Sequence, residues 1–284
     1  MCCEVYKGSG PAQLPLVLGG HSFIEQLGND PAPSPEGAAE LVERCLDAGI
    51  TWFDTTYQPE RVALGAALAR LGRRPEAHLI AWNFFEAFGP GDEVGDAAAY
   101  EAHSLDQICE ELGTDRVELL VVHPVEDAAA QRRQEELAGT WLAEGRVGEL
   151  GLWAFSATEL RTVRRDVPYA WIVAPFNAAD RAAADVFPAA RGRGARGIAT
   201  SPFGRGWDLE RLVAAASTQG GSSTADAAAE VADLMLRFSL FESSADRLVV
   251  SMRRPRWIPA NVASVERGPL NATERERLTN LISS

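Results

Sequence analysis

The stretch GITWFDTTYQPERVALGAAL, residues 49–68, contains the two patterns that indicate the fold. It opens with the short apolar run ITWF (50–53), which is typical of a buried strand, and it continues into a helical pattern over 60–71. Asp54 stands between them, at the end of the apolar run. A buried strand that leads into a helix is the repeating unit of a parallel α/β structure, and polar groups at such strand ends are candidates for chemistry.

The same unit recurs along the chain. Apolar runs alternate with helical patterns, and few of the runs alternate apolar with polar residues, as expected for strands covered on both faces. The runs lie at 14–20, 50–53, 78–82, 117–122, 147–153, 170–175, 196–201 and 247–252. The helical patterns lie at 36–48, 60–71, 101–112, 129–143, 156–164, 180–191 and 225–241.

Eight strand-and-helix units predict an α/β fold of the (β/α)₈ TIM barrel type, forming one domain over 1–284. A doubly wound open sheet would favour a glycine-rich GxGxxG turn after the first strand, and LGGHSF (18–23) does not fit that pattern. The tail 270–278 predicts an extra C-terminal helix with Asn271 or Thr273 as its N-cap. Segments 86–99 and 204–225 are predicted to be irregular.

Composition narrows the classes of partner. The chain has 284 residues, is 46% hydrophobic and carries a formal net charge of -13, which argues against binding to nucleic acid or to an anionic membrane surface. Four cysteines without CxxC spacing predict free thiols. No signal peptide and no apolar stretch of about 20 residues is seen, so we expect a cytoplasmic protein that acts on a small molecule, with its oligomeric state left open.

Several blocks of the sequence resemble the aldo-keto reductase superfamily. They are GITWFDTT (49–56), VELLVVHPVED (117–127), WLAEGRVGELGLWAFSATEL (141–160), SPFGRG (201–206) and RLVVSMRRPRWIPANV (247–262). The resemblance spans nearly the whole chain and keeps the order of the blocks. It implies an NADPH-linked oxidoreductase that reduces a small carbonyl substrate.

The family's catalytic set is Asp, Tyr, Lys and His, and the resemblance carries only part of it onto this chain. Asp54 and His123 match their positions, whereas Tyr57 lies three residues after Asp54 where the family typically has five. Asn83 stands where the lysine is expected, and Lys7 is the only lysine of the chain. In the family the lysine ammonium lowers the pKa of the tyrosine, so its loss is expected to slow or change the reaction.

His21, just past the first apolar run, is a further acid–base candidate because of its location. A metal site formed by His21, Asp54 and His123 has no supporting motif spacing, so no metal is predicted.

The positions that hold the nicotinamide carboxamide in the family are altered. Trp153 and Ala154 stand at the first two, and Val173, four residues before Asn177, stands at the third. Because three polar partners are replaced, a carboxamide buried there would lose about 1–3 kcal/mol for each unsatisfied group. Trp153 and Asn177 are still predicted to be among the cofactor-binding residues.

The phosphate half of the predicted cofactor site is better preserved. Ser201, Gly204 and Gly206 form a loop whose backbone N–H groups can bind a pyrophosphate. Arg253 and Asn261 match family positions that face the 2′-phosphate and the adenine. NADPH is therefore the expected cofactor.

Three functions remain open. The first is an atypical NADPH-linked carbonyl reductase that uses Tyr57 or His123 as proton donor. The second is a non-redox dehydratase, lyase or isomerase in which His123 and Asp54 act as acid and base. The third is a binding or regulatory protein that keeps the fold and has lost the chemistry.

Overall fold

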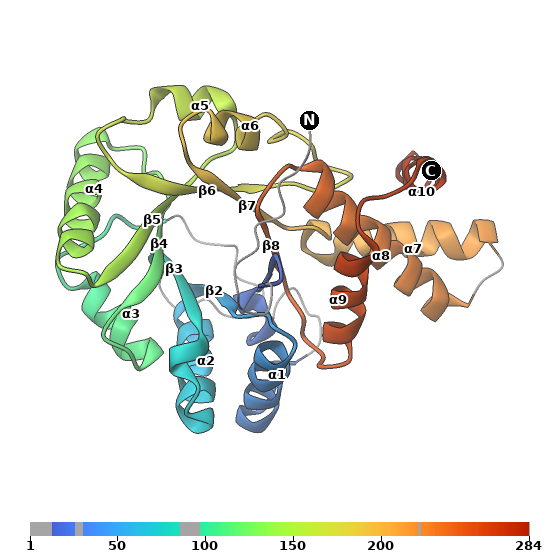
Figure 1. Ribbon diagram of the computed structural model, residues 1–284, viewed down its shortest axis with the longest axis horizontal. Helices are drawn as coiled ribbons and strands as arrows, with labels where there is room; N and C mark the ends of the chain where they lie inside the picture. The colour runs from blue at the N-terminus through green and yellow to red at the C-terminus, as the bar shows by residue number, and fades with distance from the viewer. Residues whose placement is uncertain (1–12, 26–30, 86–96, 221–222, 284) are drawn as a thin grey trace.

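Eight parallel strands close into a barrel with helices around it, as predicted (Figure 1). The computed structural model describes residues 13–25, 31–85, 97–220 and 223–283. The strands pair in sequence order, and β1 (Leu16–Leu18) closes the barrel by pairing with β8 (Arg247–Val250) in the register Val17↔Val249.

The remaining strands are β2 (Trp52–Tyr57), β3 (His78–Phe85), β4 (Val117–Val122), β5 (Val147–Trp153), β6 (Tyr169–Pro175) and β7 (Arg196–Thr200). The α-helices are α1 (Pro35–Asp47), α2 (Gln58–Leu71), α3 (Ser104–Leu112), α4 (Ala128–Ala143), α5 (Ala157–Thr162), α6 (Val186–Arg191), α7 (Trp207–Gly220), α8 (Thr224–Glu242), α9 (Trp257–Arg267) and α10 (Ala272–Ile282). Three short 3₁₀ turns are η1 (Gly20–Ser22), η2 (Arg74–Glu76) and η3 (Gly204–Gly206).

Side chains that alternate along each strand build two separate cores. One cluster lies between the strands and the helices, and the other fills the barrel interior. Ile80 and Trp82 of β3 belong to the interior cluster, whereas Leu79 and Ala81 belong to the outer one. This alternation decides which residues of each strand can reach the mouth of the barrel.

The junction between β2 and α2 has no loop. The strand was expected to end at Asp54, but β2 continues to Tyr57 and α2 begins at the next residue. Pro59 lies in the first turn, and the side chain of Glu60 accepts hydrogen bonds from the backbone N–H groups of Thr56 (2.7 Å) and Tyr57 (3.2 Å). Glu60 therefore satisfies the donors at the start of the helix and fixes Tyr57 at the end of the strand.

The C-terminal part differs from the prediction in one segment. Residues 204–225, expected to be irregular, contain η3, α7 and the start of α8. Leu209, Leu212 and Ala216 give α7 an apolar face at helical spacing, which the nearby glycine and serine residues obscured in the sequence. Of the other irregular segment, 86–96 lies outside the described residues. The predicted terminal helix is confirmed as α10, with Asn271 as its N-cap.

A substitution at Gly20 tests how tightly the junction between β2 and α2 is packed. A Cβ at Gly20 would lie 2.2 Å from Oε2 of Glu60 and 2.8 Å from the backbone oxygen of Asp54, so Gly20→Ala should lower the free energy of unfolding by about 1–3 kcal/mol. Gly139→Ala, in α4, is the matched control, because nothing lies within 4 Å of its Cβ. Its helix propensity should improve by up to about 1 kcal/mol. Equal effects in urea unfolding would contradict this packing.

Candidate active site

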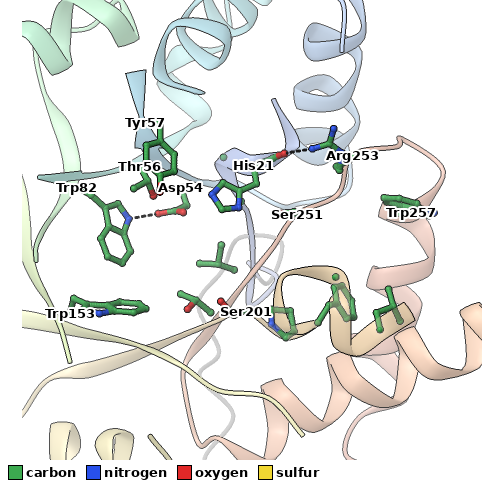
Figure 2. A pocket seen from close by; sticks show the side chains of 18 residues that line it. His21, Asp54, Thr56, Tyr57, Trp82, Trp153, Ser201, Ser251, Arg253 and Trp257 are labelled. Carbon is green, nitrogen blue, oxygen red and sulfur yellow. Dashed lines mark hydrogen bonds between the residues drawn. The ribbon is translucent and has the colours of Figure 1, made fainter. Parts of the chain in front are cut away.

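A cavity of about 470 Å³ opens at the carboxyl ends of the strands (Figure 2). Its volume suits a small substrate or part of a cofactor, and this end of a barrel is where active sites are found. Seven residues predicted from the sequence line it: His21, Asp54, Tyr57, Trp153, Ser201, Gly206 and Arg253. Five others do not line it: Asn83, His123, Asn177, Gly204 and Asn261.

Asp54 is the buried carboxylate of the cavity wall. Its side chain is 8% exposed, and its Oδ1 accepts a hydrogen bond of 2.6 Å from Nε1 of Trp82. Burial raises the pKa of Asp54 to about 7, against the opposing effect of the Trp82 hydrogen bond. Near neutral pH this carboxyl group can therefore gain or lose a proton.

Asn83 does not lie in the cavity, which corrects its assignment as a site residue. Its side-chain amide accepts from the backbone N–H of His123 (3.0 Å) and donates to the backbone oxygen of His123 (2.8 Å) and to Oε1 of Gln134 (3.2 Å). Asn83 is thus a fully buried link between the ends of β3 and β4. Strand alternation places Trp82 on the inner face, so the indole of Trp82, and not the amide of Asn83, lies beside Asp54.

His123 packs against the cavity wall but is not part of it. Its ring stacks on Trp153, with centroids 6.1 Å apart and planes at 17°, and its Nδ1 lies 3.0 Å from the backbone oxygen of Pro124. Trp153 contacts Trp82 on the cavity side at 5.1 Å. The indole of Trp153 therefore stands between His123 and the indole that binds Asp54, so an acid–base pair of His123 and Asp54 does not share the cavity.

His21 takes the place at the cavity that was expected for His123. It lies in η1, and its ring stacks on Tyr57, with centroids 5.9 Å apart and planes at 15°. Its Nε2 is 3.6 Å from Oε1 of Glu60, which is fully buried. Burial and, to a lesser degree, the charge of Asp54 raise the pKa of Glu60 to about 8, although two backbone N–H groups favour its ionised form.

Glu60 and Trp82 were not predicted as site residues, although the spacing of each in the sequence could have indicated its position. Glu60 lies three residues after the N-cap Tyr57, the spacing of a capping-box acid. Trp82 is two residues beyond Ile80, the spacing of one strand face.

The loop after β7 has the backbone geometry of an anion site. Ser201 has φ of 60° and Gly206 has φ of 97°, both in the left-handed region, and both residues line the cavity. Gly204, with φ of 54°, packs instead against the carboxylate of Asp208, where a Cβ would lie 1.9 Å from Oδ2. The N–H groups of Gly204 and Gly206 donate to the backbone oxygens of Ser201 (3.1 Å) and Phe203 (2.9 Å), so a pyrophosphate here would lie against Ser201 and Gly206 without an N–H bond from either glycine.

Arg253 and Trp257 line the same end of the cavity. The guanidinium of Arg253 donates to the backbone oxygens of His21 (2.8 Å) and Ile24 (2.5 Å), so it ties the β1–α1 connection to β8. Trp257, at the start of α9, is 38% exposed and offers an aromatic face. The cavity thus has a cation and a stacking surface at one end.

Asn177 does not line the cavity but binds the backbone of Ser201, which does. Its Oδ1 accepts from the backbone N–H groups of Ala179 and Asp180, and its Nδ2 donates 3.0 Å to the backbone oxygen of Ser201. Asn261 is half-buried on α9, away from the lining. Val173, beside Trp153 in the β5–β6 register, is buried in the barrel interior.

The cavity lining suits the phosphate end of a dinucleotide better than its nicotinamide end. At one end Arg253 provides a positive charge and Trp257 an aromatic face, which suit a pyrophosphate and an adenine. At the other end the wall includes Trp153, so a nicotinamide ring would stack on an indole instead of bonding through amide groups. With this difference, the residues present fit the cofactor.

A barrel with acid–base side chains at its strand ends is the architecture of a TIM-barrel enzyme. The family model for the aldo/keto reductase family matches residues 15–283, so the chain belongs to that family. Its members generally carry out NAD(P)H-linked carbonyl reduction.

Solved structures agree on the fold. An aldo-keto reductase of Bacillus halodurans in its holo form has a TM-score of 0.71 at 20% identity, covering 94% of this chain and 91% of that one. A Pseudomonas aeruginosa protein assigned to the aldo-keto reductases has a TM-score of 0.65 at 22% identity, covering 89% of each chain.

Two further searches concern the described residues. None of their helices is long and apolar enough to span a membrane. No group of three or more His, Cys, Asp or Glu side chains among them is arranged to hold a metal ion.

The raised pKa of Asp54 couples its protonation to folding. Between its ordinary value of 3.8 and about 7 the folded chain binds more protons than the unfolded chain, so stability falls as pH rises through this range. Asp54→Asn keeps an acceptor for Trp82 and removes the titration. The variant should exceed the wild type by roughly 2–4 kcal/mol at pH 8 and by nothing below pH 4, measured by urea unfolding. Asp166→Asn, an exposed control, should show no such gain, and parallel pH profiles for Asp54→Asn and wild type would contradict the coupling.

Proposed function

We propose that the protein reduces a small carbonyl substrate with NAD(P)H, using Tyr57 as proton donor and His21 in place of the family's lysine. The observation that carries the proposal is the meeting of Tyr57, His21 and Asp54 on one cavity wall, with the imidazole stacked on the phenol. A bound nicotinamide would supply the hydride equivalent to the carbonyl carbon. All other chemistry falls to this chain's own side chains.

Tyr57 is positioned to give a proton to the carbonyl oxygen. It is 2% exposed, and it is fixed at the end of β2 because its backbone N–H binds Glu60. An unperturbed phenol has a pKa of roughly 10 and is a weak acid at neutral pH. A protonated His21 beside the ring supplies the positive charge that makes proton release easier.

In this proposal Glu60, together with His21, supplies the proton that restores Tyr57 after each turnover. Because its pKa is raised to about 8, the pair of Glu60 and His21 holds at least one exchangeable proton near pH 7. The proton that leaves Tyr57 with the alcohol product is replaced from this pair, and the pair is recharged from water. Asp54, bound to Trp82, stays outside this relay and faces the substrate.

The proposal predicts distinct effects of two substitutions at the cavity. Tyr57→Phe and His21→Gln should each lower kcat for 4-nitrobenzaldehyde by about 10²–10⁴-fold, because both remove parts of the proton donor. NADPH affinity should change little, because His21 contacts Arg253 through its backbone oxygen, which the substitution keeps, and Tyr57→Phe removes only a hydroxyl. Turnover is followed by NADPH absorbance, and cofactor binding by quenching of tryptophan fluorescence.

Matched controls are available outside the cavity. Tyr169→Phe removes a hydroxyl that binds Glu135, and His103→Gln removes an exposed imidazole. Both should keep kcat within about twofold of wild type. Full activity in Tyr57→Phe, or losses in the controls as large as in the site variants, would contradict the assignment.

The pH profile should report the state of Glu60. Turnover needs the proton held by the Glu60–His21 pair, so kcat should fall as pH rises above about 8, the pKa of Glu60. Glu60→Gln keeps an oxygen for the N–H groups of Thr56 and Tyr57 but cannot titrate, and it should move or abolish this limb. Glu76→Gln, an exposed control, should leave the profile unchanged. An identical alkaline limb in Glu60→Gln and wild type would exclude Glu60.

A non-redox dehydratase, lyase or isomerase is the second candidate. The observation that favours it is the cavity wall at Trp153, where an indole lines the cavity at a position that the family resemblance gives to a polar partner of the nicotinamide. In this case His21 and Asp54, rather than His123 and Asp54, would act as acid and base. Absence of NADPH binding would favour this reading, and saturable binding without turnover would favour a cofactor-binding protein that has lost the reaction.

A further inference from the structure

The wall around Asp54 holds two buried carboxyl groups, and none of the described residues forms an ion pair with Asp54. Asp54 and Glu60 are both buried and lie close enough for the charge of Asp54 to raise the pKa of Glu60. Glu60 has His21 at 3.6 Å and two backbone N–H groups. Within the part of the chain that the structure describes, the carboxylate of Asp54 accepts only the Trp82 N–H and has no basic side chain in ion-pair distance.

The nearest charged groups on the packed elements have other partners. Arg61 of α2 forms an ion pair with Glu111 and donates 2.8 Å to the backbone oxygen of Thr56. Arg253 follows β8 and binds the β1–α1 connection, and Figure 2 shows it on the far side of His21 from Asp54. Because the carboxyl group of Asp54 lines the cavity, the cavity side of Asp54 is where a ligand's positive charge gains the most.

The surfaces around this place are aromatic. The indoles of Trp82 and Trp153 meet at 59° with centroids 5.1 Å apart, and both line the cavity together with Tyr57 (Figure 2). Aromatic faces attract a cation through their quadrupole, and they do so most strongly when water is excluded. Their faces offer little to an anion.

We propose that this cavity binds an organic ammonium group, with the charged nitrogen at Asp54 and against the faces of Trp82 and Trp153. The proposal rests on the proposed function in one respect: if the protein is a carbonyl reductase, its substrate carries a positively charged amine on one side and its carbonyl at Tyr57 on the other. The ligand then supplies the positive charge that no described residue supplies at Asp54.

The test is binding of choline compared with 3,3-dimethyl-1-butanol, its neutral isostere, at pH 8 without NADPH. Calorimetry and tryptophan fluorescence measure affinity, and sodium chloride holds the ionic strength constant. Choline should bind at least tenfold more tightly than the alcohol. Equal affinities, or no choline binding, would overturn the proposal. The carbonyl reductase proposal is judged separately, by NADPH binding and turnover.

Substitutions at the cavity test where the ammonium group of choline binds. Asp54→Asn should weaken choline binding at least tenfold and leave the alcohol within twofold, whereas the exposed Asp166→Asn should change neither. Trp82→Lys should abolish choline binding, because its own ammonium takes the place beside Asp54. Trp153→Leu should lower choline affinity more than alcohol affinity. If Asp54→Asn binds choline as wild type does, the site is elsewhere.

Lys7, the only lysine of the chain, lies outside the described residues and needs its own control. Lys7→Ala should leave choline affinity within twofold of wild type. A tenfold gain in this variant would identify Lys7 as the cation that normally occupies the place, and would contradict the ligand proposal.

Discussion

The mouth of the barrel depends on the buried carboxylate of Glu60. One of its oxygens receives the N–H groups of Thr56 and Tyr57, and the other faces His21. These contacts join the end of β2, the start of α2 and the turn after β1 without any loop between strand and helix. A glycine at position 20 is required because the backbone passes against this carboxylate. An ionisable group therefore helps to position His21 and Tyr57, in addition to the apolar packing of Tyr57 in the barrel interior.

The second constraint is that the residue of β3 beside Asp54 is Trp82, which is uncharged. Where a lysine would place an ammonium next to Asp54, Trp82 places a hydrogen-bond donor without charge. The donor satisfies one oxygen, but it does not compensate the electrostatic cost of burying a carboxylate, so the pKa of Asp54 rises to about 7. The proposed roles of His21 and of a cationic ligand both follow from this exchange.

Much of the fold could be predicted from the sequence, because strand and helix patterns repeat with little interruption from 14 onward. The positions of Asp54, Tyr57 and Ser201 at the cavity also followed from their places at strand ends. The assignment of Asn83 failed because aligning a motif by order ignored the two-residue period of a strand, which sends Asn83 outward and Trp82 inward. His123 was misplaced for a different reason. The bulk of Trp153 separates it from the cavity, and such packing between side chains of different strands is not written in either strand alone.

The state of the Asp54 carboxyl group in the free protein tests the central claim most directly. Carbon-13 NMR of labelled aspartate, with Asp54→Asn to assign the resonance, would follow its titration from pH 3 to pH 9. The expected midpoint lies near pH 7, because among the described residues this buried carboxyl group is bound only to an indole N–H. A midpoint at or below pH 4 would show that a positive charge already lies beside Asp54, and would contradict the account.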